Sequence, residues 1–158
     1  LSELLHALFA DAAPDEEIGD DMTFALYVAD SYLTFRSRYR FAPDLKLMLD
    51  LLLIDETNPR SVAYQLSRLS EHIGQLPKSA GDAHRAPDQR LALDLLTQVR
   101  LADLDQLAAV SEEGRREELA ELLGAVFAEL PHLSELVSRQ YFSLANEQPR
   151  RLQSQTRS

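Results

Sequence analysis

Residues 22–40 read MTFALYVADSYLTFRSRYR, and this stretch decides the fold class. Its core-facing side chains recur at steps of three and four residues, at Phe24, Tyr27, Val28, Ser31, Tyr32, Phe35 and Tyr39. Such spacing places side chains on one face of an α-helix, whereas a half-buried strand would alternate polar and apolar residues. No segment of the chain alternates in that way over the length of a strand. The stretch therefore predicts a long amphipathic helix with a broad buried stripe.

The same periodicity extends through most of the chain. It predicts further helices over residues 43–55, 59–75, 88–110, 117–130 and 131–144, and the last turns of a helix over 1–9. Asn58 followed by Pro59 indicates a helix cap with proline in the first turn, and Pro131 is expected to end one helix and start another. Residues 11–21 and 77–87 are predicted loops, and residues 149–158 a flexible tail. We therefore expect an all-α fold, an antiparallel bundle of about six helices in a single domain over residues 1–148.

Composition narrows the classes of function. The 158 residues are 45% hydrophobic, and 16 Lys+Arg against 26 Asp+Glu give a net charge of −10. This charge argues against nucleic acid and against an anionic membrane as partners, because both attract basic surfaces. The absence of cysteine excludes thiol catalysis, zinc fingers and disulfide scaffolds. No run of about 20 apolar residues and no signal peptide is found, so we expect a cytoplasmic protein. Because the chain begins with Leu1 rather than methionine, we expect a piece of a longer protein.

The sequence offers little for catalysis. Its 5 glycines stand singly, which excludes a P-loop and a dinucleotide fingerprint, and no serine lies in a Gly-x-Ser-x-Gly elbow. Glu129 and His132 match the Glu-x-x-His spacing of di-iron bundles, but Pro131 is expected to place them in different helices. No second pair of this kind occurs. We therefore predict no catalytic residue, no metal and no cofactor, and a metal-dependent enzyme is the least favoured of three alternatives.

Arginines mark a candidate binding surface. Arg36 and Arg40 are four residues apart and share a helical face, Arg38 is expected to point elsewhere, and Arg60 lies in the first turn of the helix predicted after Asn58. A helix N-terminus attracts anions, and a guanidinium adds a bidentate donor for phosphate or carboxylate. Alternatively, the arginines pair with nearby acids and lock the junction between helices. The acids in reach by sequence include Asp44, Asp50 and Asp55.

These residues also carry a resemblance to a known family. Residues 31–39 read SYLTFRSRY, where the alpha-E family has the pattern Ser-x-x-Thr-Tyr-Arg-x-Arg-Tyr, and the match continues through LDLLLIDETNPRS at 49–61. Further matches are Ala63, Gln65-Leu66, Leu76-Pro77 and residues 139–143, so the chain resembles the family over residues 22–143. Phe35 stands where the family usually has tyrosine, and the Glu-Arg dipeptide for which the family is named does not occur. Because a full-length member is longer, the chain resembles the C-terminal half of such a domain.

The resemblance implies an all-helical domain that occurs beside, or fused to, circularly permuted ATP-grasp ligases and transglutaminase-like proteins. It implies a non-catalytic accessory or scaffold role in making or modifying peptide or amide bonds. The expected partner is such a ligase or transglutaminase-like protein, or a peptide or anionic ligand. The other alternative is a purely structural or oligomerising helical module, which would form a homodimer. The candidate anion-binding or partner-binding residues are Tyr32, Arg36, Tyr39, Arg40, Asn58, Arg60 and Gln65.

Overall fold

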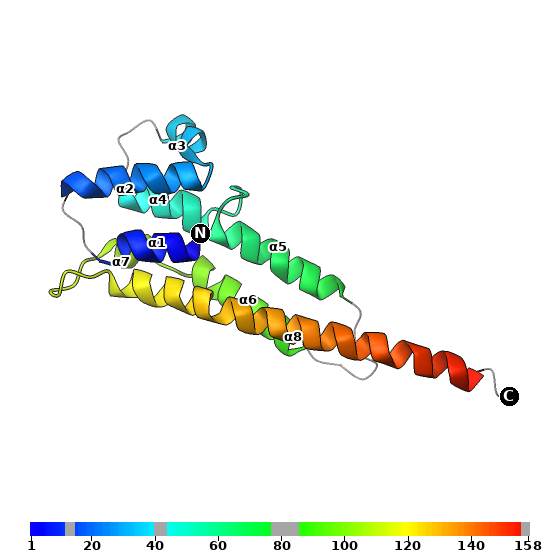
Figure 1. The fold of residues 1–158 in the computed structure, drawn as a ribbon. Coiled ribbons are helices and arrows are strands. Elements are labelled where there is room, and N and C mark those ends of the chain that lie inside the picture. Colours follow the sequence, from blue (N-terminus) through cyan, green and yellow to red (C-terminus); the bar gives the residue numbers. More distant parts are fainter. Residues whose placement is uncertain (12–14, 40–43, 77–85, 156–158) are drawn as a thin grey trace.

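The computed structural model describes residues 1–11, 15–39, 44–76 and 86–155, which fold into helices (Figure 1). The elements in chain order are α1 (Ser2–Phe9), α2 (Asp15–Val28), α3 (Tyr32–Arg38), α4 (Leu45–Leu49), the π-helical turn η1 (Asp50–Ile54), α5 (Val62–Gln75), α6 (Pro87–Arg100), α7 (Leu104–Ala108) and α8 (Glu117–Gln155). No strand occurs in these ranges, where an isolated bridge joins Asp11 to Arg115. The predicted all-α fold is confirmed, although some predicted helices are divided and the last two are joined into α8.

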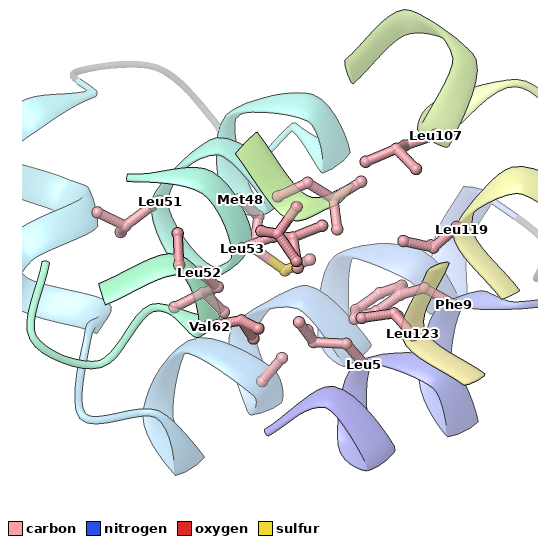
Figure 2. Packing of buried hydrophobic residues seen from close by; sticks show 14 of the residues in the cluster. Leu5, Phe9, Met48, Leu51, Leu52, Leu53, Val62, Leu107, Leu119 and Leu123 are labelled. Carbon is pink, nitrogen blue, oxygen red and sulfur yellow. The ribbon is translucent and has the colours of Figure 1, made fainter. Parts of the chain in front are cut away.

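The core surrounds α4 and η1. Leu51, Leu52 and Leu53 of η1 are consecutive and all fully buried, whereas Asp50 and Ile54 at the two ends of η1 are partly exposed. Leu5 and Phe9 from α1 belong to the same apolar cluster, as do residues from α2, α5, α6, α7 and α8 (Figure 2). α1 contacts both α2 and α8, and Figure 1 shows it lying between them. The three successive leucines therefore lie in one apolar cluster with side chains of α1, α2 and α8.

The helix predicted over residues 22–40 is broken in two, which corrects the prediction. α2 starts earlier, at Asp15, so most of the predicted loop 11–21 is helical; it ends at Val28, before α3 begins at Tyr32. Asp30 has a φ of 50°, the Ser31 N–H donates to Leu26 O at 2.8 Å, and the Asp30 N–H donates to Tyr27 O at 3.0 Å. These bonds form a Schellman motif, with aspartate in the left-handed position that glycine usually takes. The sequence does not indicate this break, because the helical spacing of the apolar residues continues across the turn.

Two further helix boundaries differ from the prediction, because Ser61 and Asp103 cap the helices that follow them. α5 begins at Val62 rather than Pro59, because Ser61 Oγ accepts the Tyr64 N–H at 3.0 Å and thus serves as the cap assigned to Asn58. The helix predicted over 88–110 is two helices, since Asp103 Oδ1 accepts from the Asp105 N–H at 2.8 Å and starts α7. Of the predicted loop 77–87, residues 77–85 lie outside the described residues, and α6 begins at Pro87.

Pro131 does not divide the last helix. α8 continues from Glu117 to Gln155, so the predicted restart at Pro131 is wrong, and helix also extends into the predicted tail 149–158. Val126 and Leu133, on either side of the proline, are 1% and 2% exposed and pack into the core. Burial of these side chains favours a continuous helix and offsets the cost of a proline in a helix interior. No helix in the described part of the chain is long and apolar enough to cross a membrane.

Candidate functional site

Asn58 is the polar centre of the junction between α3, η1 and α5. Its side chain is buried, and Nδ2 donates to Leu51 O at 2.9 Å and to Ser31 Oγ at 3.4 Å. Its Oδ1 accepts the backbone N–H of Arg60 at 3.1 Å. The amide therefore holds the start of η1, the start of α3 and the turn before α5 in one arrangement. With both ends of the amide engaged inside the fold, Asn58 acts here as a structural residue.

Arg60 and Gln65 lie on the outer side of this junction. Arg60 Nη2 donates to Asp30 Oδ2 at 3.0 Å, and these side chains are 58% and 81% exposed. Gln65 Nε2 donates to Pro59 O at 2.6 Å. Such an exposed ion pair contributes about 0–1 kcal/mol to stability, so another carboxylate or phosphate can replace Asp30 at small cost.

Two adjoining cavities share Arg60, Gln65 and Leu1, and we call them together the Arg60 groove. One, of about 280 Å³, lies between α5 and α8; the other, of about 400 Å³, lies beside the turn that follows α2. The walls are mostly apolar, with side chains that include Leu4, Val28, Val62, Leu66, Leu69, Val126 and Leu130. The groove thus combines an apolar surface with the Arg60 guanidinium, the Gln65 amide and the Asp30 carboxylate at its edge.

The other predicted site residues differ in burial and in their contacts. Tyr32 is half-buried and stacks on Tyr27, with ring centroids 4.4 Å apart. Tyr39 is also half-buried, and its hydroxyl donates to Asp50 Oδ2. Burial, together with the Asp50 carboxylate, raises the pKa of Tyr39 to about 12. The Arg36 side chain is exposed and forms no hydrogen bond or ion pair with the described residues, and Arg40 lies outside them. Asn58, Arg60 and Gln65 are therefore brought together, whereas Tyr39 and Arg36 are not part of their hydrogen-bond network.

Arg38 was not among the predicted binding residues, yet it is the arginine that reaches the turn after η1. Its guanidinium donates to the Asp55 carboxylate and, at 3.1 Å, to Thr57 Oγ1. Asp55 Oδ1 also accepts from the Thr57 N–H at 2.8 Å and from its hydroxyl at 2.7 Å. Burial opposes ionisation of Asp55, but the bonds from Thr57 and Arg38 outweigh it and lower the pKa of this carboxyl. In the sequence, the Asp-x-Thr spacing of Asp55 and Thr57 could have indicated this turn, because it is typical of turns capped by a side chain.

Glu129 and His132 belong to one helix, which corrects their predicted separation by Pro131. His132 Nδ1 and Glu129 Oε2 are 3.2 Å apart at the surface of α8. In the described ranges no group of three or more histidine, aspartate or glutamate side chains is placed to hold a metal ion. The pair is a surface contact between neighbouring turns of a helix.

Fold and groove together define a helical domain with an apolar recess that has Arg60 and Gln65 at its edge. The family model for Alpha-E, described as a predicted alpha-helical domain with a conserved ER motif, matches residues 1–142. The chain therefore belongs to the Alpha-E family. The Glu-Arg dipeptide of that description is absent from these 158 residues.

Curated proteins similar to the chain are named as uncharacterized proteins. Uncharacterized protein Rv2567 of Mycobacterium tuberculosis and Uncharacterized protein Mb2597 of Mycobacterium bovis are each 31% identical to the chain over 119 residues. The matched segment covers 75% of this chain and 13% of each relative, so the chain spans only a small part of their length. No solved structure matches the chain.

Proposed function

We propose that this domain is a non-catalytic accessory module that acts with an ATP-grasp ligase or a transglutaminase-like protein in making or modifying peptide or amide bonds. The Arg60 groove is the contact surface, and it takes an anionic or amide-bearing segment of the partner or of the peptide. The observation that supports this proposal is that Arg60 and Gln65 both line the two adjoining cavities. Because an ATP-grasp ligase consumes ATP, we place the domain in the cytoplasm.

The chemistry of the groove suits a peptide. Apolar walls from α5 and α8 would cover an aliphatic side chain, and the Gln65 amide can bond to a peptide group. The Arg60 guanidinium would bind a carboxylate in two parallel hydrogen bonds, in exchange for its single bond to Asp30. No chemical step by the domain itself is required, and its contribution is to hold and orient.

The test compares Arg60→Ala with the matched variant Arg68→Ala. Both remove an exposed arginine in or next to α5, but Arg68 pairs with Glu71 and does not line the groove. Binding of each purified chain to a circularly permuted ATP-grasp ligase and to a transglutaminase-like protein from the same organism is measured by interferometry. We expect Arg60→Ala to weaken binding about tenfold, because an arginine anchor is lost, and Arg68→Ala to leave it unchanged. Equal binding by all three chains, or binding to neither protein, would contradict the proposal.

A second candidate function, an oligomerising module, is favoured by one observation. Phe24, Tyr27 and Val28 of α2 are exposed and lie three and four residues apart, and Leu33 of α3 is 80% exposed. Exposed apolar side chains that share a helical face are typical of a contact surface. Light scattering over a concentration series should show a dimer that the double variant Phe24→Ser/Tyr27→Ser abolishes. A strict monomer at every concentration rules this function out.

A further inference from the structure

A second cleft lies where α6, α7 and α8 meet. It has a volume of about 520 Å³ and is lined by the end of α6, by α7 and by the first turns of α8. Its apolar surface includes the buried Leu107 and the half-buried Leu122, while Leu101 at its edge is 79% exposed. None of its residues lines the Arg60 groove, so this cleft is a separate feature of the molecule.

All charged residues that line this cleft are acidic, and we therefore call it the acidic cleft. They are Asp103, Glu118 and Glu121. The Asp103 carboxylate is engaged as the cap of α7. The exposed side chains of Glu118 and Glu121 form no ion pair or hydrogen bond with the described part of the chain, and they are three residues apart on one face of α8.

This arrangement is not explained by helix stability. An acidic residue in the first turn of a helix interacts favourably with the helix dipole, which accounts for Glu118. Glu121 lies beyond that turn, where the dipole effect has fallen off and where the like charge of Glu118 repels it. A cation placed between the two carboxylates would remove this repulsion.

We infer that the acidic cleft binds a lysine or arginine side chain carried by a segment of a partner protein. The alkyl stem of such a side chain lies along Leu107 and Leu122, and its cationic head reaches the carboxylates of Glu118 and Glu121. The exposed Leu101 gives a neighbouring aliphatic side chain of the same segment a contact. The acidic lining matches a basic segment in charge and repels an anionic one. This inference is independent of the proposed function, because it concerns different residues and a different ligand charge.

The test uses a labelled, end-capped peptide of lysine, leucine and alanine, and a second peptide in which glutamate replaces each lysine. Binding is followed by fluorescence anisotropy with the wild-type chain, Glu118→Gln/Glu121→Gln, and the matched control Glu112→Gln/Glu113→Gln. Glu112 and Glu113 are exposed in the turn before α8 and do not line the cleft, so both double variants change the net charge equally. We expect the cleft variant to bind the lysine peptide about tenfold more weakly, and the control to bind it like the wild type.

A second set of measurements separates a docking surface from general charge attraction. Leu101→Ala should weaken binding of the lysine peptide several-fold. It should not change the circular dichroism spectrum, because this side chain is solvent-exposed in the folded chain. Spermidine, which carries positive charge but no aliphatic side chain, should compete only weakly with the peptide. The inference is overturned if the two double variants bind alike, if the glutamate peptide binds as well as the lysine peptide, if spermidine displaces the peptide at equal concentration, or if the wild-type chain binds neither peptide.

Discussion

Replacing Asn58 with alanine should destabilise the fold far more than the loss of one surface amide. The variant leaves the buried carbonyl of Leu51 without its donor, and the Arg60 N–H without its acceptor. Ser31 loses little, because its contact with Asn58 is long at 3.4 Å and its hydroxyl still donates to Ala29 O at 3.0 Å. An unsatisfied buried group costs about 1–3 kcal/mol and an ordinary hydrogen bond about 1 kcal/mol, so we expect a loss of roughly 2–4 kcal/mol.

Urea unfolding followed by circular dichroism measures this loss directly. In a domain of this size it corresponds to a fall of roughly 4–16 °C in melting temperature. The matched control is Gln65→Ala, which removes another amide that donates to a backbone carbonyl of the same turn but from an exposed position. That control should change the free energy of unfolding by no more than about 0.5 kcal/mol. If Asn58→Ala and Gln65→Ala are equally stable, Asn58 does not hold the junction and the reasoning fails.

The isosteric change Asn58→Asp adds a test by pH. At neutral pH the variant keeps an oxygen for the Arg60 N–H but places a carboxylate against Leu51 O, where the native amide donates. It should be at least as unstable as Asn58→Ala. Protonation gives the carboxyl a donor again, so the instability relative to Asn58→Ala should shrink as the pH falls toward about 4. A constant difference between the two variants across this range would contradict the assignment of the donor.

Two further predictions concern Tyr39 and Pro131. Tyr39 has a folded pKa of about 12, above the unfolded value of about 10, so its contribution to stability is complete below pH 10 and is lost as the pH rises toward 12. Ultraviolet titration should show one of the 5 tyrosines ionising near pH 12, and Tyr39→Phe should remove that step; ionisation of all tyrosines near pH 10 would refute this. Pro131→Ala should raise the free energy of unfolding by about 1–2 kcal/mol, because the roughly 3 kcal/mol cost of an interior proline exceeds the entropy that proline removes from the unfolded chain. An unchanged or lower stability in urea would show that α8 bears no strain at Pro131.

The helical character of the chain could be predicted with confidence from spacing alone, but the ends of helices could not. Asp30 and Asp103 interrupt two predicted helices, and neither is a glycine or a proline. Aspartate occurs inside helices, at caps and in left-handed turns, so its presence does not say which of these it adopts. At Pro131 the sequence predicts a helix end that the structure does not have. The free-energy cost of a proline inside the helix is outweighed there by the burial of Val126 and Leu133.

The part of the candidate site that lies within one short segment was predictable, because residues close in the chain stay close in the fold. The sequence marked Arg60, Gln65 and Asn58 as neighbours because they lie within one short segment, and the structure does bring them together. It did not reveal that Asn58 is buried, or that Asp30 is the partner of Arg60, since the two are separated by 30 residues along the chain. The choice of Arg38 over Arg36 for Asp55 depends on where the broken helix turns, which is a tertiary property.

By itself, the sequence determined that this is an acidic, cysteine-free, all-helical chain, because composition and a period near 3.6 are properties of local order. The tertiary structure alone decided which acid faces which arginine, and where recesses form. The Arg60 groove draws on α1, α5 and α8, and the acidic cleft on α6, α7 and α8. Such surfaces arise when segments distant in the chain pack on the leucines of η1, and no pattern within a single helix encodes them.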